Sequence, residues 1–413
     1  MLQNPPRSKQ WSAWLMVGLW SLFIFLTIPL APMIGALVAE RWGRDLFTYL
    51  VLVTIAAALI TLVYRAVRTG LMTFRGSYFW LTLVAATFAG YTLLLGGKSP
   101  EESIHFIQYG VLGVLVFRAL AIKRHDASIF FSAAAICGII GTIDETIQWL
   151  VPQRLWDLRD IWINFLAAAL VQVAIALGLK PAFLAPRPSR ANLRFLCRLL
   201  VAAAVILGTN LLNTPPRIAW YAERIPGLEY LLVNESVMLE YGFLYDDPDI
   251  GVFRSRLAPD ALRAADRERA AEAAAILNRF RDRSDYKTFL SLYTPVNDPF
   301  VHEARVHLFS RDANFEIAME KKAHGEKYAG NLNDAYRQNQ ILEKYFPHTL
   351  RSSDSEWPIE KRTLAQKHLR HDKRFESFVS RHLITRISET QVILFCALLV
   401  LGFVLLAKHF KDP

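Results

Sequence analysis

The sequence predicts an all-α membrane protein. We expect a polytopic bundle of about eight spanning helices, with an extracytoplasmic, mostly helical domain inserted between spans 7 and 8. Of the 413 residues, 53% are apolar and only 20% are charged, and the mean hydropathy is +0.23. A soluble protein of this length usually carries more charge. Several apolar runs approach or exceed the roughly 20 residues that cross a bilayer, and one long polar segment, 213–389, separates the last two runs.

The apolar runs define the predicted spans in order along the chain. They are Trp14–Val38, Leu46–Tyr64, Phe79–Gly96, Ile104–Ala121, Ser128–Val151, Asp160–Leu179, Phe195–Leu212 and Thr390–Ala407. The first run is longer than the apolar core of a signal peptide and is followed by another membranous segment, so we interpret it as an uncleaved anchor. The predicted parts are spans 1–3 (1–97), a membrane core (98–179), span 7 (180–212), the inserted domain (213–389) and the last span with its tail (390–413).

Lysine and arginine in the short connections predict the sidedness of the spans, because cytoplasmic loops are enriched in them. One side holds Arg7, Lys9, Arg65, Arg68, Arg75, Lys123, Arg124, Lys180, Arg187, Arg190, Arg194, Lys408 and Lys411. The other side holds only Arg41, Arg44, Lys98, Arg154 and Arg159. Both termini are therefore expected in the cytoplasm, and residues 213–389 outside it.

Charge and cysteine usage exclude several classes of protein. Segment 213–389 holds 27 basic and 27 acidic residues, so the whole net charge of +10 belongs to the apolar part. That distribution suits membrane loops, and no basic-aromatic stripe indicates a nucleic-acid partner. Cys137, Cys197 and Cys396 each lie in an apolar run, which argues against a disulfide framework or a cysteine metal site.

The inserted segment predicts a helical domain large enough for its own core. Apolar residues recur at helical spacing from Leu262 to Phe280, and Asp260 is the expected N-cap after Pro259. Further helices are expected near 300–323, 332–346 and 358–386. Strand signals are few.

Three groups in this segment could bind a metal, but each has a plainer interpretation. His368 and His371 are three apart and would share a helix face. His302 and His307 are five apart, which is less suitable. For both pairs, solvated surface histidines are the expected arrangement. The acidic cluster Asp246, Asp247 and Asp249 could hold a hard cation, although a turn with a helix-capping aspartate explains it more simply.

The strongest signal is a set of polar residues inside the predicted spans, where ionisable groups are costly. Glu101 and His105 share a face of the fourth span with Gln108 or Tyr109. Asp144, Glu145 and Gln148 lie near the end of the fifth span. Asp160 and Asn164 share a face at the start of the sixth.

Sequential helices with short connections are usually neighbours, so these three stripes should meet near the outer leaflet. The expected site residues are Glu101, His105, Tyr109, Asp144, Glu145, Gln148, Arg154, Asp157, Arg159, Asp160 and Asn164. Glu102 and Lys98 add charge beside them. In one interpretation, Arg154 and Arg159 bind a phosphate or carboxylate. In another, carboxylates with His105 hold a divalent cation or perform acid–base chemistry. In a third, the network only ties the helices together.

The same residues resemble the VanZ-like family of bacterial membrane proteins over about residues 98–179. The matching elements are Glu101/Glu102, His105-Phe106, Tyr109-Gly110, Asp144-Glu145, Gln148, Pro152, Arg154, Asp157, Asp160 and Asn164. The resemblance implies a protein of the bacterial cytoplasmic membrane and cell envelope. The founding member is associated with teicoplanin resistance, and the family implies no established reaction. Where relatives have a glycine-rich stretch after Asn164, this chain has 165–169, Phe-Leu-Ala-Ala-Ala.

Three functions follow as hypotheses. The first, which we favour, is binding of an anionic lipid or cell-wall precursor head group at the outer leaflet. The second is a membrane-embedded hydrolase or transferase of a phosphorylated lipid, with His105, Asp144 and Glu145 as candidate catalytic residues and a divalent cation as an optional cofactor. The third is an assembly role in which segment 213–389 binds a periplasmic protein or polymer. The sequence assigns no metal ligands.

Overall fold

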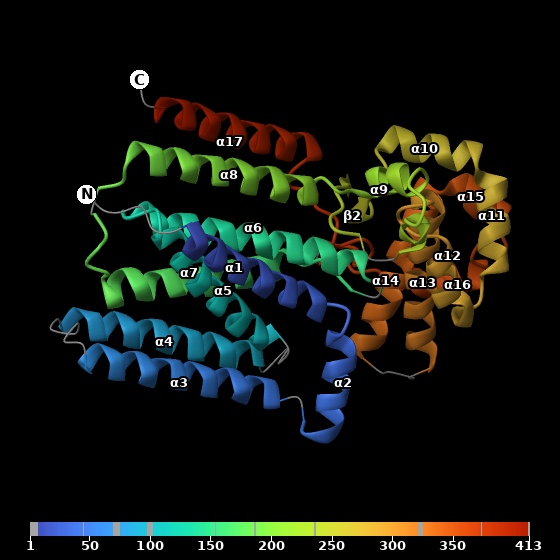
Figure 1. Ribbon diagram of the computed structural model, residues 1–413. Helices are drawn as coiled ribbons and strands as arrows, with labels where there is room; N and C mark the ends of the chain where they lie inside the picture. The colour runs from blue at the N-terminus through green and yellow to red at the C-terminus, as the bar shows by residue number, and fades with distance from the viewer. Residues whose placement is uncertain are drawn as a thin grey trace. The chain divides into compact units, whose positions relative to one another are not determined.

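The computed structural model describes residues 7–43, 45–68, 75–96, 102–152, 154–185, 187–234, 237–320, 325–372 and 374–411. The chain divides into two compact units (Figure 1). Unit 1 comprises Met1–Asn210 and Ile393–Pro413, and unit 2 comprises Leu211–Val392.

Unit 1 is built from helices. They are α1 (Arg7–Thr27), α2 (Ala31–Arg41), α3 (Leu46–Arg68), α4 (Arg75–Gly96), α5 (Ser103–Ala121), α6 (Ser128–Leu150), α7 (Leu158–Val173), α8 (Arg190–Leu211) and α17 (Glu389–His409). A π-helical turn, Ala174–Leu179, extends α7. Seven described helices are long and apolar enough to cross a bilayer, or eight if the bent pair formed by α2 and α3 counts as one span. These helices indicate a multi-pass membrane protein.

The first predicted span, Trp14–Val38, is wrong in its extent. Helix α1 ends at Thr27, a turn follows, and α2 starts at Ala31. Pro29 and Pro32 explain the break, because proline cannot donate the backbone hydrogen bond that a continuous helix needs. Pro32 is accommodated in the first turn of α2, where that donor is not required.

Helices α5, α6 and α7 form the centre of unit 1. Ile129 on α6, together with Ile163 and Ala167 on α7, is fully buried. A Cβ added to Gly113 of α5 would lie 3.4 Å from the Cα of Ala168, so the missing side chain lets α5 and α7 approach closely. Small residues at the contact thus place the polar ends of these helices next to one another.

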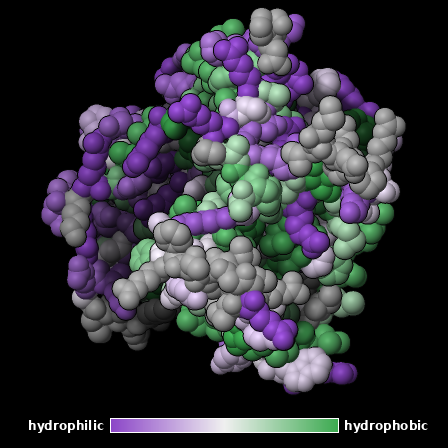
Figure 2. Space-filling view, turned by 60° about the vertical axis from the view of Figure 1, so that its left-hand side comes forward, coloured by the Kyte–Doolittle hydropathy of each residue, from purple (hydrophilic) through white to green (hydrophobic). Residues whose placement is uncertain are grey.

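Apolar side chains remain exposed on the outer helices of unit 1. Helix α17 buries none of its residues, and Leu398 is 67% exposed. In the view of Figure 2, areas of apolar residues lie beside groups of hydrophilic ones. An apolar helix exposed in this way suits contact with lipid chains.

Unit 2 is mostly helical but contains a hairpin that the sequence did not predict. Its elements are α9 (Pro215–Ala222), β1 (Phe243–Asp247), β2 (Gly251–Ser255), α10 (Pro259–Glu268), α11 (Ala270–Arg279), α12 (Tyr286–Leu292), α13 (Pro299–Glu320), α14 (Glu326–Tyr345), α15 (Pro347–Ser352) and α16 (Ile359–Gln366), with short 3-10 turns at Glu229–Val233 and Arg283–Asp285. Strands β1 and β2 are antiparallel. Phe253, Phe289 and Phe346 lie in the core.

Two predicted helix boundaries in unit 2 are wrong. Ala258, not Asp260, is the N-cap of α10, because Pro259 occupies the first helical position. The helix expected over 358–386 ends at Gln366. The described residues after it form turns at 367–368 and 379–382, and isolated bridges join Glu376 to Val252 and Ile384 to Tyr241.

The segment 374–388 leads into α17, and we call it the strap. The backbone of Val252 exchanges hydrogen bonds with the strap, donating to the Phe375 carbonyl (2.9 Å) and accepting from Ser377 N–H (2.8 Å). Gly251 has φ +115°, and an added Cβ would collide with the Phe375 carbonyl oxygen. A glycine is therefore required where the strap crosses the hairpin.

Candidate functional site

The predicted site lies at one end of the α5–α6–α7 bundle. It is formed by the start of α5, the end of α6, the connection 151–157 and the start of α7. Asp157 is the N-cap of α7 and accepts a hydrogen bond from Arg159 N–H at 2.8 Å. This cap fixes where α7 begins and so places Asp160 and Asn164 next to α6.

A chain of hydrogen bonds joins the end of α6 to the connection after it. Gln148 Nε2 donates to Glu145 Oε1 (2.6 Å), and the Arg154 guanidinium donates to Gln148 Oε1 (2.5 Å). The backbone N–H of Asp157 donates to Glu145 Oε2 at 3.3 Å. Glu145 is fully buried. Gln148 thus separates the carboxylate of Glu145 from the cation of Arg154 while contacting both.

A second contact joins α5 to α6. The Tyr109 hydroxyl donates to Asp144 Oδ2 at 3.1 Å, and both side chains are buried. The His105 ring lies one turn away on α5, with its centroid 6.4 Å from that of Tyr109. A Cβ on Gly141 would come within 3.1 Å of Asn164 Cβ and 3.4 Å of Tyr109 Cε1. Gly141 therefore allows these three helices to meet at the site.

Several buried polar atoms of this cluster have no hydrogen-bond partner among the residues that the structure describes. They are His105 Nδ1, Asp144 Oδ1, Arg154 Nε, Trp156 Nε1, Asp160 Oδ1 and both amide atoms of Asn164. Leaving a buried donor or acceptor unsatisfied costs about 1–3 kcal/mol each. Native proteins rarely concentrate such atoms in one place, so the cluster has an unusual capacity to bind a polar group.

Other predicted residues lie at the edge of the cluster. Arg159 and Asp157 are exposed, and the Arg159 guanidinium pairs with Glu102. Gln108 is buried, and its backbone carbonyl accepts a hydrogen bond from Trp20 Nε1 at 2.9 Å. Glu101 and Lys98 lie outside the described residues.

The sequence prediction missed Trp156, whose buried indole N–H is one of the unpartnered donors. Its only signal was its place between Arg154 and Asp157 in the connection. The cluster holds several carboxylates. Even so, in the part of the chain that the structure describes, no three His, Cys, Asp or Glu side chains are arranged to hold a metal ion.

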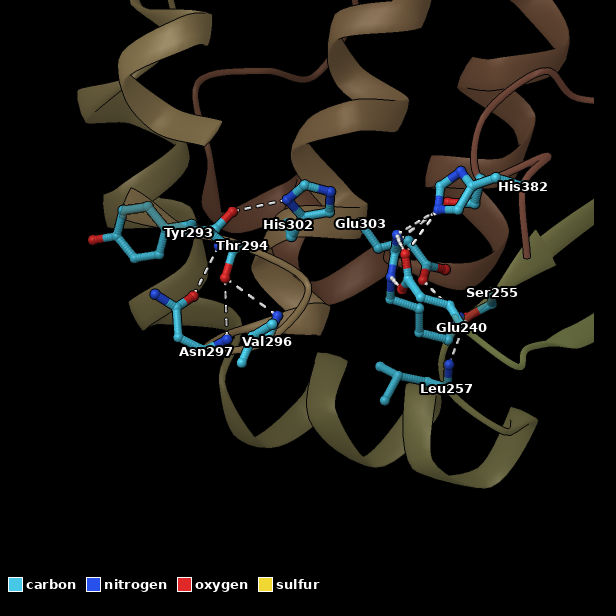
Figure 3. Close-up of polar contacts among 12 residues, drawn as sticks. Glu240, Ser255, Leu257, Tyr293, Thr294, Val296, Asn297, His302, Glu303 and His382 are labelled. Atoms are coloured by element: carbon cyan, nitrogen blue, oxygen red, sulfur yellow. Dashed lines mark hydrogen bonds and ion pairs between the residues drawn. The ribbon is translucent and has the colours of Figure 1, made fainter. Parts of the chain in front are cut away.

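Unit 2 contains a separate buried polar network around α13 (Figure 3). The expectation that His302 and His307 are solvated is wrong, because they are 9% and 0% exposed. His302 Nδ1 contacts the Tyr293 carbonyl at 2.8 Å, and His307 Nδ1 contacts Gln338 Oε1 at 2.7 Å. Burial lowers the pKa of each imidazole to about 4, assisted by the positive charge of Arg256.

Glu240 is the charged centre of this network. Its carboxylate is bonded by Arg256 Nε at 2.5 Å and lies 2.8 Å from His382 Nε2 on the strap. Burial would raise the pKa of Glu240, but the bond to His382 and the charge of Arg256 together hold it at about 2. Neighbouring Glu303 is fully buried, and burial raises its pKa. The network ties the strap to the hairpin.

The remaining predicted groups have structural roles. Asp247 lies in the hairpin and accepts hydrogen bonds from the backbone of Asp249 and Ile250, at 3.0 and 3.2 Å. The turn interpretation of the acidic cluster is thus confirmed, although the turn joins two strands and caps no helix. His368 and His371 follow the end of α16, so the expectation that they share a helix face is wrong.

No family model matches the chain, and neither the curated proteins nor the solved structures contain a significant match to it.

Proposed function

We propose that this protein is a VanZ-like integral membrane protein of the bacterial cell envelope that binds the polar head group of an anionic lipid or lipid-linked cell-wall precursor at the outer leaflet. The observation that supports the proposal is the set of unpartnered buried atoms at the meeting of α5, α6 and α7. The family assignment rests on the sequence resemblance over 98–179, and the sidedness rests on the distribution of lysine and arginine.

The unpartnered atoms indicate the chemistry of the ligand. Arg154 Nε, Trp156 Nε1 and the Asn164 amide nitrogen are donors, which suit the oxygens of a phosphate or carboxylate. Asp144 Oδ1 and Asp160 Oδ1 are acceptors, which suit hydroxyl or amine groups. A head group that combines an acidic group with hydroxyls or an amine satisfies both sets.

Lipid analysis of the full-length protein tests this function. The protein is extracted with its native lipid, and co-purifying lipids are identified by mass spectrometry. We expect the parent and an Arg41→Ala control, which changes an exposed arginine on α2, to retain one acidic lipid species. We expect Arg154→Ala and Asp144→Asn to retain at least tenfold less. Equal lipid profiles in all four proteins would contradict the proposal and leave the cluster as a contact between helices.

Hydrolysis or transfer of a phosphorylated lipid is a second candidate function. It is favoured by the unpartnered atoms of His105 and Asp144, an imidazole and a carboxylate in one buried cluster. The variant Glu145→Gln distinguishes the binding function from the enzymatic one. Lipid turnover by the parent that is lost in this variant supports an enzyme, whereas retained lipid binding without turnover supports a binding protein. If every cluster variant behaves like the parent and removal of 213–389 abolishes function, an assembly role applies.

A further inference from the structure

A second polar site lies between α8 and α17, away from the cluster described above. The two helices run side by side in unit 1 (Figure 1), and a Cβ on Gly208 would lie 3.3 Å from Cys396 Sγ. Between the start of α8 and the end of α17 lies a cavity of about 380 Å³. Its lining residues are Arg194, Arg198, Val201, Val404, Ala407, Lys408 and Lys411.

The charge of this cavity comes from both helices. Arg194, Arg198 and Val201 recur at four and three residues, so they share one face of α8. Val404 and Lys408 share a face of α17, and Lys411 follows the helix end. The described lining therefore includes four cationic side chains and no carboxylate. The nearby N-terminus of α8 adds the positive end of a helix dipole.

The two helix ends are held together by a direct contact. Arg194 donates from Nε and Nη2 to the Phe410 carbonyl at 3.2 and 2.9 Å. Arg198 and Lys408 line the cavity and are exposed. Among the described residues, Asp126 is an acidic group that contacts the start of α8. It accepts hydrogen bonds from the Ser189 backbone (2.9 Å) and the Asn192 side chain (2.6 Å), so it is already occupied by donors.

We propose that this cavity binds the head group of an anionic phospholipid in the leaflet that contacts the N-terminal end of α8. The lining combines cations with the apolar side chains of Val201, Val404 and Ala407. A free phosphate ion would use only the cations, whereas a phospholipid uses both, with its phosphate on the basic side chains and the start of its chains against the apolar ones. Basic pockets between membrane helices bind acidic head groups in this way.

Native mass spectrometry of the full-length protein in nanodiscs tests the site. The nanodiscs contain phosphatidylglycerol and phosphatidylcholine, which share a phosphate but differ in net charge. We expect the parent to retain phosphatidylglycerol preferentially. Arg198→Gln combined with Lys408→Gln should weaken this retention about 30-fold, at about 1 kcal/mol for each basic residue. Arg187→Gln combined with Arg190→Gln removes the same charge at the start of α8, outside the residues that line the cavity, and should change retention little.

A charge-neutral change separates the cavity from general surface charge. Ala407→Phe fills the cavity and should also abolish preferential retention, whereas Leu405→Phe, at an exposed position on α17, should not. The proposal would be overturned if both double charge variants lost phosphatidylglycerol retention equally. Full retention of this lipid in Ala407→Phe would overturn it too. Displacement of the lipid by millimolar inorganic phosphate would also overturn it, in favour of a free-anion site. None of these variants touches the cluster of α5–α7, so this site can fail while the proposed function stands.

Discussion

At position 164 an asparagine is completely buried, and neither atom of its amide has a hydrogen-bond partner in the described part of the chain. Unsatisfied buried atoms lower the stability of the fold. Under the proposed function, the amide gains its hydrogen bonds when the head group binds. Stability exchanged for a binding function is common at functional sites.

Replacing Asn164 by leucine should stabilise the ligand-free protein while removing head-group retention. The gain should be about 1–3 kcal/mol, because two unsatisfied polar atoms are removed at nearly constant volume. Thermal unfolding of the full-length protein in lipid-free detergent measures the first effect, and lipid mass spectrometry the second. Asn210→Leu is the matched control. Asn210 is also buried, but it accepts from Thr146 (2.9 Å) and donates to the Ile206 carbonyl (3.0 Å), so its loss should destabilise. Destabilisation of both variants to the same extent would contradict this account of Asn164.

Among the helices, the approach of α6 to α5 and α7 depends on Gly141. Gly141→Val should lower the free energy of unfolding by about 1–3 kcal/mol, because the new side chain forces Asn164 and Tyr109 apart. Lipid retention should fall with it. Gly90→Val on α4 is the control, since a Cβ there has no atom within 4 Å. Denaturant titration of the full-length protein in detergent compares the two, and equal stability would show that α6 can shift without cost.

Sequence patterns predicted the membrane helices better than the elements of unit 2, for physical reasons. A span must satisfy its backbone internally, so a long apolar run has essentially one interpretation. Asp144, Glu145 and Asn164 could be placed near one another because they lie at the ends of consecutive helices. The hairpin and strap could not, because Val252 and Phe375 are far apart in sequence and pair through their backbones. His307 was mistaken for a surface residue because its partner, Gln338, lies on another helix.

On the scale of the whole molecule, the folding stability of unit 2 should fall at acidic pH. His302 and His307 are buried and have pKa values of about 4 in the folded state, against about 6.5 when unfolded. Between these values the unfolded chain binds more protons, so stability is present above pH 6.5 and is lost as the pH falls toward 4. Burial raises the pKa of Glu303, so this carboxyl changes stability in the opposite direction. The effect of one carboxyl on stability does not cancel that of two histidines. The loss is on the order of 3 kcal/mol for each histidine.

Hydrogen exchange of the full-length protein at pH 6.5 and pH 4.5, corrected for the intrinsic rate, measures this effect in α13 and α14. Protection there should fall at the lower pH. His307→Gln should reduce the pH dependence, because one of the two titrating groups is removed, whereas exposed His371→Gln should leave it unchanged. A pH dependence that is unaltered in His307→Gln would assign the effect to other groups.

The pairing of α8 with α17 has a consequence for biosynthesis. The ribosome completes α8 at Leu211 and must then make 212–388 before α17 begins at Glu389. At about 5–20 residues per second, that interval lasts roughly 10–40 s. Throughout it, Arg194 and Arg198 lack the helix that later lies beside them. If the cavity binds an acidic phospholipid as proposed, this lipid binds the nascent α8 first and is in place when the last helix inserts.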